Sequence, residues 1–224
     1  MCTTCGCGQP DSLLTKVFLS NEDKARHNQQ HLDQASVIGI NLMASPGAGK
    51  TTLIEATIPA GIPFGVIEGD LAEDIDTQRL QRKQIPCVQI TTQTACHLDA
   101  QMIHEALHHL PLDRLELLFI ENIGNLVCPK DFALGERYRV VLLSVPEGDD
   151  KIEKYAPIFA GADAIVITKT DLLPFFDFDM RKAKDAIASL APKAQYFAVS
   201  ATTGEGIDAW QNWLKTLVPE KTLQ

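Results

Sequence analysis

Seven short runs rich in valine, isoleucine and leucine recur along this chain, and helix-like stretches separate most of them. Alternation of this kind is typical of a mostly parallel sheet with helices on both faces. Because several runs are almost continuously apolar, we expect the strands to be covered on both sides. The pattern predicts a doubly wound α/β fold. The runs are Val37–Ala44, Phe64–Glu68, Cys87–Thr91, Leu115–Glu121, Val140–Val145, Ala164–Thr168 and Tyr196–Val199.

Composition narrows the classes of protein to which the chain can belong. The chain has 224 residues, of which 45% are hydrophobic, which is enough for one domain with a sizeable core. Its net charge is −9 and it has no block rich in Lys and Arg, which argues against nucleic acid or an anionic membrane as a partner. No apolar run approaches ~18 residues and no secretory leader pattern is visible, so we expect a cytoplasmic protein.

The N-terminal part differs from the rest of the chain in being polar and charged. Ser20-Asn-Glu-Asp23 has the form of a capping box, which predicts a helix that begins there and carries His27 and His31. We expect this segment to pack loosely outside the sheet. We therefore divide the chain into an N-terminal cysteine tail at 1–8, a lead-in helix or linker at 9–36 and a sheet domain at 37–219.

A glycine-rich loop, Ser45-Pro-Gly-Ala-Gly-Lys-Thr-Thr52, follows the first apolar run, and a helix-like stretch continues from it. In a phosphate-binding loop the glycines let backbone N–H groups turn toward an oxyanion, the lysine reaches the β and γ oxygens, and the next hydroxyl binds Mg²⁺. Ala44 occupies the position where the usual pattern opens with glycine, so the match is imperfect there. We assign nucleotide binding to Gly47, Ala48, Gly49, Lys50, Thr51 and Thr52.

Two carboxylates follow apolar runs at positions where strands are expected to end, Asp70 in Glu68-Gly-Asp70 and Glu121 in Phe119-Ile-Glu-Asn-Ile-Gly124. The carboxyl ends of parallel strands form the ligand crevice of an open sheet. We expect Asp70, Glu121 and Thr51 to hold Mg²⁺ or act on the attacking water, and Gly124 to offer its N–H to a γ-phosphate. The alternative is that both acids are ordinary solvated loop residues. The predicted catalytic set is Lys50, Thr51, Asp70 and Glu121.

The choice of base depends on Thr168-Lys-Thr-Asp171, which directly follows an apolar run. A carboxylate accepts hydrogen bonds from N1–H and the exocyclic amine of guanine, but it meets an acceptor at N1 of adenine. Asp171 therefore favours GTP, with the Lys169 stem packed along the base. The familiar motif begins with Asn, so Thr168 predicts reduced affinity with specificity retained. The base site is assigned to Lys169, Asp171, Ser200 and Ala201.

Three cysteines, Cys2, Cys5 and Cys7, lie within the first eight residues. Gly6 and Gly8 let the backbone fold back, so the thiolates can converge on one thiophilic ion. We expect a planar Ni²⁺ site whose fourth ligand is a backbone or terminal nitrogen. In a reducing compartment such cysteines are better interpreted as ligands or free thiols than as disulfides.

Another set of metal-binding side chains lies further along the chain. Cys96 and His97 are adjacent at an expected helix start, and Cys128 follows a strand. Two sulfurs and one imidazole form an incomplete site for Zn²⁺ or Ni²⁺, which a second subunit could complete. The alternative is a purely structural role for the Cys-His pair. The histidines within 104–109 are interpreted as a solvated helix face, and Cys87 as a core residue.

Taken together, these motifs resemble those of the hydrogenase nickel-incorporation GTPases, HypB, within the class of dimerising metal-chaperone GTPases. The resemblance spans nearly the whole chain. It implies a GTP-gated homodimer that loads nickel into the large subunit of [NiFe]-hydrogenase, alongside a small nickel chaperone of the HypA type. The motifs are Cys2-Thr-Thr-Cys-Gly-Cys7, Ser45-Pro-Gly-Ala-Gly-Lys-Thr-Thr52, Glu68-Gly-Asp70, Cys96-His-Leu-Asp-Ala-Gln-Met-Ile103, Glu121-Asn-Ile-Gly-Asn-Leu-Val-Cys-Pro129 and Leu172-Leu-Pro-Phe175.

The resemblance also implies a high-affinity nickel site in the cysteine tail and a lower-affinity nickel or zinc site at Cys96, His97 and Cys128. This chain departs from the family in Thr168 and in lacking the long histidine-rich stretch that some members carry, which argues against nickel storage. Two other functions are a metal-buffering or scaffold protein with structural nucleotide, and a urease nickel-loading GTPase. Measurable GTP turnover would distinguish an enzyme from a buffering or scaffold protein. The cysteine motifs argue against the urease-loading alternative.

Overall fold

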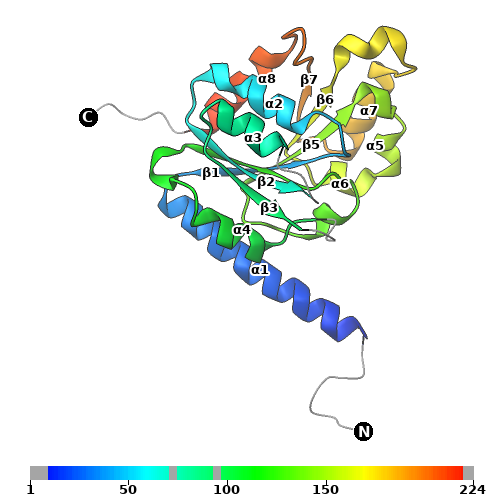
Figure 1. Ribbon diagram of the computed structural model, residues 1–224. Coiled ribbons are helices and arrows are strands. Elements are labelled where there is room, and N and C mark those ends of the chain that lie inside the picture. The colour runs from blue at the N-terminus through cyan, green and yellow to red at the C-terminus, as the bar shows by residue number, and fades with distance from the viewer. Residues whose placement is uncertain (1–9, 71–74, 93–96, 219–224) are drawn as a thin grey trace.

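The computed structural model describes residues 10–70, 75–92 and 97–218. Within them, seven parallel strands form one sheet in the order β3-β2-β4-β1-β5-β6-β7. This arrangement confirms the doubly wound α/β prediction (Figure 1). The strands are β1 (Ile38–Met43), β2 (Phe64–Asp70), β3 (Cys87–Thr91), β4 (Leu117–Glu121), β5 (Tyr138–Ser144), β6 (Ala164–Thr168) and β7 (Gln195–Ala198).

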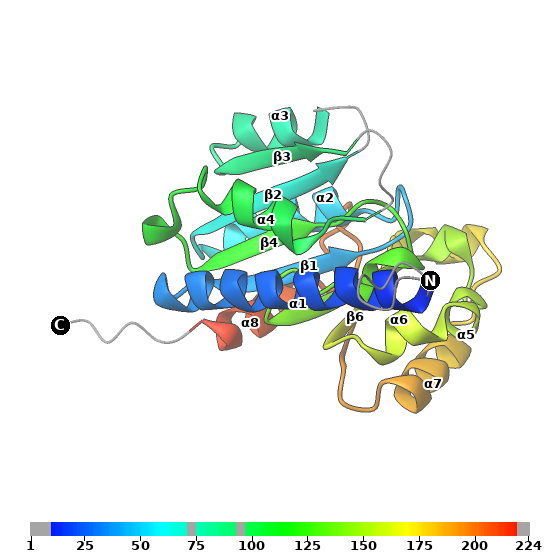
Figure 2. The same ribbon diagram turned by 90° about the horizontal axis from the view of Figure 1, so that it is seen from below.

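Helices cover both faces of the sheet (Figures 1 and 2). The α-helices are α1 (Pro10–Gln34), α2 (Lys50–Thr57), α3 (Ile75–Arg82), α4 (Ala100–Leu107), α5 (Lys151–Lys154), α6 (Ala156–Ala160), α7 (Met180–Leu190) and α8 (Ile207–Leu217). Short 3-10 helices lie at η1 (Ile58–Ala60), η2 (Leu112–Arg114), η3 (Cys128–Asp131), η4 (Val145–Glu147) and η5 (Thr170–Phe175). No helix among the described residues is both long and apolar enough to span a bilayer.

The sheet separates two layers of hydrophobic core. Helices α2, α3 and α8 pack on one face, where Phe119 and Trp210 are fully buried. Trp210 donates a hydrogen bond from Nε1 to Oγ1 of Thr57 over 3.0 Å, so its one polar group is satisfied inside the core. Helices α1, α4, α5, α6 and α7 pack on the opposite face. Because the central strands β1 and β4 are buried on both sides, their residues alternate little between apolar and polar, whereas the edge strands β3 and β7 are only partly buried.

Helix α1 differs from its sequence-based prediction in two respects. It begins at Pro10 and not near Ser20, since proline is tolerated in the first turn, where its missing N–H has no helical acceptor. It also packs firmly and not loosely, because Asn28 and Leu32 lie on one stripe and are 0% and 2% exposed. Two carbonyl oxygens, those of Ala100 and Leu134, accept hydrogen bonds from Nδ2 of Asn28. The polar composition of the segment concealed this buried stripe.

Candidate functional site

The loop between β1 and α2 lies at the carboxyl edge of the sheet, on the right in Figure 1. Gly47 and Gly49 have φ angles of +72° and +96°, a region that other residues occupy only with strain. Lys50 and Thr51 begin α2 and are only 8% and 6% exposed. A cavity of about 470 Å³ lies beside this loop. Backbone N–H groups at a helix start of this kind are suited to binding phosphate.

The buried carboxylate of Glu121 lines this cavity. Thr51 Oγ1 donates to it, at 2.9 Å from Oε1 and 3.1 Å from Oε2. Lys50 Nζ lies 3.8 Å from Oε1. Burial raises the pKa of Glu121 to about 7, although the charge of Lys50 and the hydrogen bond from Thr51 act in the opposite direction. The structure therefore brings Lys50, Thr51 and Glu121 within 4 Å of one another, and the fourth predicted catalytic residue, Asp70, lines the same cavity.

Further acids line the same cavity, and the sequence analysis identified only Asp70 among them. The register of β2 and β4 places Glu68 directly opposite Glu121. Burial raises the pKa of Glu68, while its hydrogen bond from Thr77 lowers it. Like charges opposite one another on neighbouring strands repel, so a cation is favoured between them. This set of carboxylate and hydroxyl oxygens fits a hard divalent ion such as Mg²⁺.

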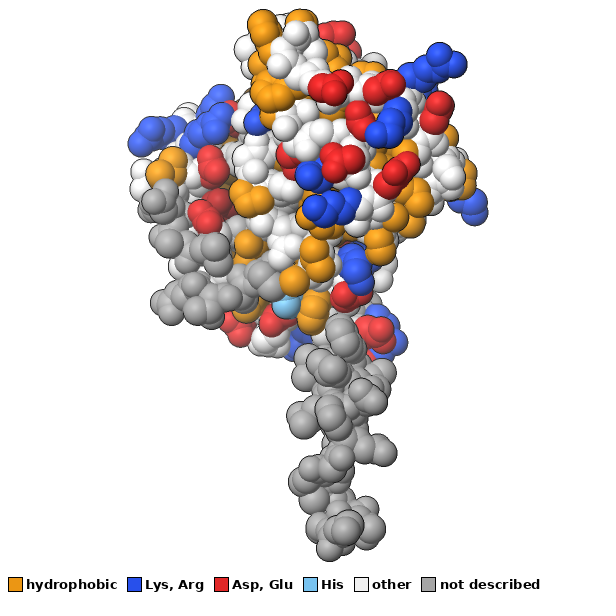
Figure 3. All heavy atoms as spheres, turned by 90° about the vertical axis from the view of Figure 1, so that its right-hand side faces the viewer, with side chains coloured by type: hydrophobic (Ala, Val, Ile, Leu, Met, Phe, Trp, Pro, Cys, Tyr) orange, Lys and Arg blue, Asp and Glu red, His pale blue; other side chains and the backbone are white. Residues whose placement is uncertain are grey.

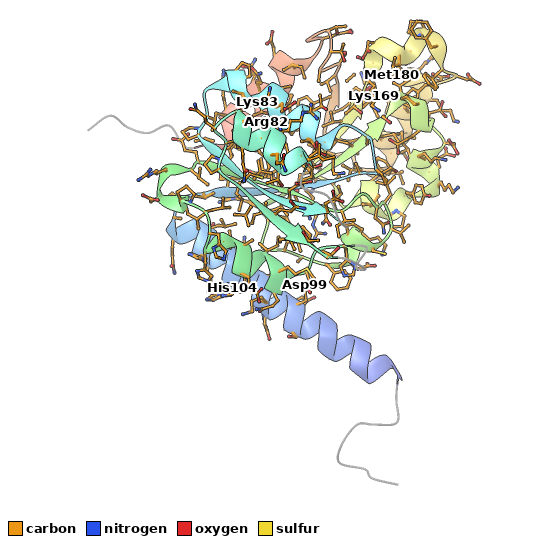
Figure 4. All side chains as sticks on the ribbon, in the orientation of Figure 1. Arg82, Lys83, Asp99, His104, Lys169 and Met180 are labelled. Carbon is orange, nitrogen blue, oxygen red and sulfur yellow. The ribbon has the colours of Figure 1, made fainter. Side chains whose placement is uncertain are left out.

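A neighbouring cavity of about 380 Å³ is lined by Lys169, Asp171 and Ala201, three of the four residues assigned to the base. Lys169 has a φ of 59° and donates from Nζ to the Gly47 carbonyl over 2.7 Å (Figure 4). The fourth residue, Ser200, is fully buried, and its Oγ accepts a hydrogen bond from the Thr203 N–H over 3.1 Å. Ser200 thus shapes the loop that carries Ala201.

Thr168, the departure from the usual motif, contacts the phosphate loop directly. Its Oγ1 donates to the Ala48 carbonyl over 2.6 Å, and both residues are buried. The threonine hydroxyl therefore braces the loop in the place of an asparagine side chain. The effect of Thr168 on nucleotide affinity stays a prediction.

The loop after β4 packs against the phosphate loop. A Cβ added at Gly124 would lie 2.8 Å from the backbone nitrogen of Pro46. This distance is too short for any larger residue unless one loop moves. Gly124 and Ile123 both line the phosphate cavity. Gly124 therefore lies beside the phosphate loop, and the role of its N–H toward a terminal phosphate stays a prediction.

The second predicted metal set is only partly visible. Cys96 lies outside the described residues, as do Cys2, Cys5 and Cys7. The His97 ring stacks on Phe132 with centroids 3.8 Å apart, and burial lowers its pKa. Cys128 begins η3 and is half-buried. In the part of the chain that the structure describes, no three such side chains form a ready metal site.

Asn122, which the sequence analysis did not assign, connects the two regions. It is 1% exposed, and its Oδ1 accepts the backbone N–H of Leu98 over 3.2 Å. Its Nδ2 donates to Oδ1 of Asn41 over 3.3 Å. One side chain therefore joins the segment that carries His97 to the strand end that carries Glu121. The sequence contained one signal for the role of Asn122, namely its position between the strand-end acid Glu121 and Gly124.

Figure 3 views the side of the molecule on which the phosphate loop lies. Acidic and basic side chains are interspersed in the upper part of this face, and hydrophobic side chains lie between and below them. Phe175, in η5, is 77% exposed, and Val127, just before η3, is 53% exposed. Phe175 thus ends the short helix that carries Asp171, and Val127 directly precedes Cys128.

Comparison with known proteins agrees with this geometry. Residues 37–198 match the model of the CobW/HypB/UreG nucleotide-binding domain. Hydrogenase maturation factor HypB of Escherichia coli K12 is 44% identical over 203 residues, which cover 89% of this chain and 70% of that protein. A crystal structure of HypB from Helicobacter pylori in complex with nickel has a TM-score of 0.85 and 37% identity, covering 91% of this chain and all of the other. HypB from Archaeoglobus fulgidus has a TM-score of 0.84 and 38% identity, over 90% and 100% of the two chains. The chain therefore belongs to the CobW/HypB/UreG family and, within it, to the HypB proteins.

Proposed function

We propose that this chain hydrolyses GTP with Mg²⁺ and uses the nucleotide cycle to deliver nickel during maturation of a [NiFe]-hydrogenase. The observation that carries the proposal is the convergence of Lys50 and Thr51 on buried Glu121, beside a second cavity that contains Asp171. The Escherichia coli relative is named a hydrogenase maturation factor, and the Helicobacter pylori relative was solved with nickel.

The chain's own residues account for the phosphate chemistry. Backbone N–H groups from Gly47 to Thr52 bind the β- and γ-phosphates, and the Lys50 ammonium contributes a positive charge to them. Thr51, Asp70 and Glu121 would hold Mg²⁺, which supplies neutralisation of phosphate charge in the transition state. The N–H of Gly124 positions the γ-phosphate.

Base selection follows from Asp171 and Lys169. The Asp171 carboxylate accepts two hydrogen bonds from guanine, and the stem of Lys169 covers one face of the base. The hydrogen bond from Lys169 to the Gly47 carbonyl joins base recognition to the phosphate loop. GTP binding therefore orders both cavities together.

Metal handling is assigned to two sets of side chains. Cys2, Cys5 and Cys7 hold Ni²⁺, and the set comprising Cys96, His97 and Cys128 binds Ni²⁺ or Zn²⁺. Three ligands leave a coordination position open, so two chains share the second site in a homodimer that forms with GTP. Asn122 transmits the nucleotide state to this set through Leu98. The partners are a nickel chaperone of the HypA type and the hydrogenase large subunit.

The experiment combines turnover with metal titration. GTP and ATP hydrolysis are measured first, and Ni²⁺ or Zn²⁺ is then titrated in GDP and in a non-hydrolysable GTP analogue with size-exclusion analysis. Cys128→Ser should weaken both metal binding and GTP-dependent dimerisation. Cys87→Ser is the matched control, because burial raises the pKa of that thiol to about 12 and it supplies no thiolate near pH 7. Equal turnover of ATP and GTP, or unchanged metal binding in Cys128→Ser, would contradict the respective part of the proposal.

A further inference from the structure

Helices α1 and α4 lie side by side on one face of the sheet, and each contributes a pair of histidines one turn apart (Figures 1 and 2). The centroids of the His27 and His104 rings are 4.9 Å apart, and those of His31 and His108 are 5.6 Å apart. Within α4 and its C-terminal cap, the His104 and His108 rings are also 4.9 Å apart. Four imidazoles thus form one cluster, which we call the histidine cluster.

The histidine cluster surrounds a surface pocket of about 200 Å³ that is remote from the nucleotide cavities. Its walls consist of imidazole and amide side chains, and His27 and His108 are exposed to solvent. An ion can therefore reach the pocket without passing through the core. Figure 4 shows His104 on α4 beside α1. The lining residues are His27, Gln30, His31, Gln34, His104 and His108.

One of these imidazoles is held in a defined tautomer. The Nδ2 of Asn28 donates to two carbonyl oxygens, at 2.7 and 3.0 Å, which leaves its Oδ1 as an acceptor. His104 Nδ1 lies 3.2 Å from this oxygen and must therefore carry the proton. In the neutral ring the lone pair is then on Nε2. Imidazoles that bind metals are oriented by this kind of hydrogen bond from the other ring nitrogen.

A second member of the cluster has an unused nitrogen. Nδ1 of His31 is buried and has no hydrogen-bond partner in the described structure. Leaving a buried polar atom unpaired is costly, so native structures rarely retain one without a role. A metal ion is one partner that an imidazole nitrogen accepts, and imidazole suits Zn²⁺ and Ni²⁺ in particular.

From this arrangement we propose that the histidine cluster is a binding site for a divalent transition-metal ion, Zn²⁺ or Ni²⁺, that bridges α1 and α4. Two imidazoles bound to one tetrahedral ion at ~2.1 Å have ring centroids roughly 5 Å apart, which matches the observed spacing. The rings as placed do not form a ready three-ligand site, so rotation of the exposed side chains must complete it. The site is distinct from the cysteine tail and from Cys96, His97 and Cys128.

The site is tested in a full-length background that lacks the other candidate ligands. The background replaces Cys2, Cys5, Cys7, Cys96 and Cys128 with serine and His97 with alanine. Ni²⁺ alone and Zn²⁺ alone are each titrated by equilibrium dialysis. We expect one equivalent of at least one ion to bind, with affinity at least tenfold weaker after His104→Ala or His31→Ala. Binding should also raise the melting temperature, since the ion ties two helices together.

His109→Ala is the matched control, because His109 is exposed on the same segment but outside the cluster. This variant should leave metal affinity unchanged, and His104→Gln keeps a polar side chain in case alanine perturbs folding. The background failing to bind either ion, or the double variant His31→Ala/His104→Ala binding as tightly as the background, would overturn the proposal. GTP turnover of the histidine variants should remain intact, so a failure here leaves the proposed nucleotide function standing.

Discussion

The phosphate cavity and the His97–Cys128 region share the segment that follows β4, which carries both Gly124 and Cys128, but they are built differently. In the phosphate cavity, Lys50, Thr51 and Glu121 are all less than 9% exposed and contact one another within 4 Å. His97 and Cys128 are only half-buried, and the His97 ring stacks on the ring of Phe132. The first region is a connected polar network within one chain, whereas the described donors of the second form no ready metal site.

This difference is informative about how nucleotide and metal chemistry can be coupled. A buried polar network holds one geometry, because breaking any hydrogen bond in it leaves a costly unpaired group. Half-buried donors on loops can adopt another geometry at lower cost. We therefore expect the metal region, and not the phosphate cavity, to change its geometry during the nucleotide cycle. The coupling free energy between nucleotide and metal binding is nevertheless reciprocal. Among the described residues, Asn122 provides one contact between the two regions.

The largest expected effect comes from removing one of the polar side chains of the phosphate cavity. Lys50→Ala or Thr51→Ala should lower GTP turnover by at least about a hundredfold, since each removes charge or an oxygen ligand at the transferring phosphate. Both variants should remain folded, because neither side chain belongs to the apolar core. Lys193→Ala, an exposed residue beyond α7, is the control. Normal turnover in both variants would mean that the phosphate cavity is not the working site.

Replacing the carboxylate assigned to base recognition, Asp171, tests the base cavity of the nucleotide site. Asp171→Asn should lower GTP affinity about ten- to a hundredfold and favour xanthosine nucleotides, because the loss of a good polar pair costs about 1–3 kcal/mol. Competition binding with GTP, ATP and XTP measures the change. Asp177→Asn removes an exposed acid outside the cavity and should have no effect. An unchanged order of preference in Asp171→Asn would contradict the assignment.

Disturbing the contact between the loop after β4 and the phosphate loop should have an intermediate effect. Gly124→Ala places a Cβ 2.8 Å from backbone atoms of Pro46, so the phosphate loop must shift. We expect turnover to fall about tenfold, because small displacements of reacting groups are costly. Gly161→Ala is matched, since its φ is −91° and the added Cβ meets nothing closer than 3.8 Å. Equal turnover in the two variants would show that the loop contact is not needed.

Cutting the link between the regions should affect coupling more than either activity. Asn122→Ala removes the acceptor for the Leu98 N–H, so the ratio of nickel affinities in a GTP analogue and in GDP should fall toward one. Coupling of 1–3 kcal/mol corresponds to about five- to a hundred-and-fifty-fold before the change. Asn41→Ala also removes a fully buried asparagine and one partner of Asn122, but it keeps the Asn122 oxygen that accepts the Leu98 N–H. The idea fails if both variants lose coupling equally.

The smallest effect concerns the brace at Thr168. Thr168→Val keeps the shape but removes the hydrogen bond to the Ala48 carbonyl, at a cost of about 1 kcal/mol or roughly fivefold in GTP affinity. Thr170→Val is the matched control, because the buried Oγ1 of Thr170 has no hydrogen-bond partner in the described structure. Isothermal titration with a non-hydrolysable GTP analogue measures both variants. A similar affinity in the two would mean that the phosphate loop holds its shape without this bond.

Several features of the nucleotide site could be predicted because they depend on neighbouring residues. The loop from Ser45 to Thr52 carries its own glycines, cation and hydroxyl, and a strand and a helix flank it in the sequence. Asp70 and Glu121 follow from the rule that parallel strands end at one edge. Glu68 was missed, because only the register between β2 and β4 places it opposite Glu121.

Periodicity and motif spacing by themselves determined the seven strands, the doubly wound sheet and the nucleotide loop, since these arise from local hydrophobicity and backbone preferences. Tertiary structure alone decided which distant side chains meet. Asn28 lies in a polar helix whose burial depends on α4, and Asn122 acquires its role through the Leu98 N–H. The two histidine pairs form one cluster only because α1 packs against α4, although more than seventy residues separate His27 from His104 in the sequence. Such contacts depend on packing between whole elements, which no local pattern encodes.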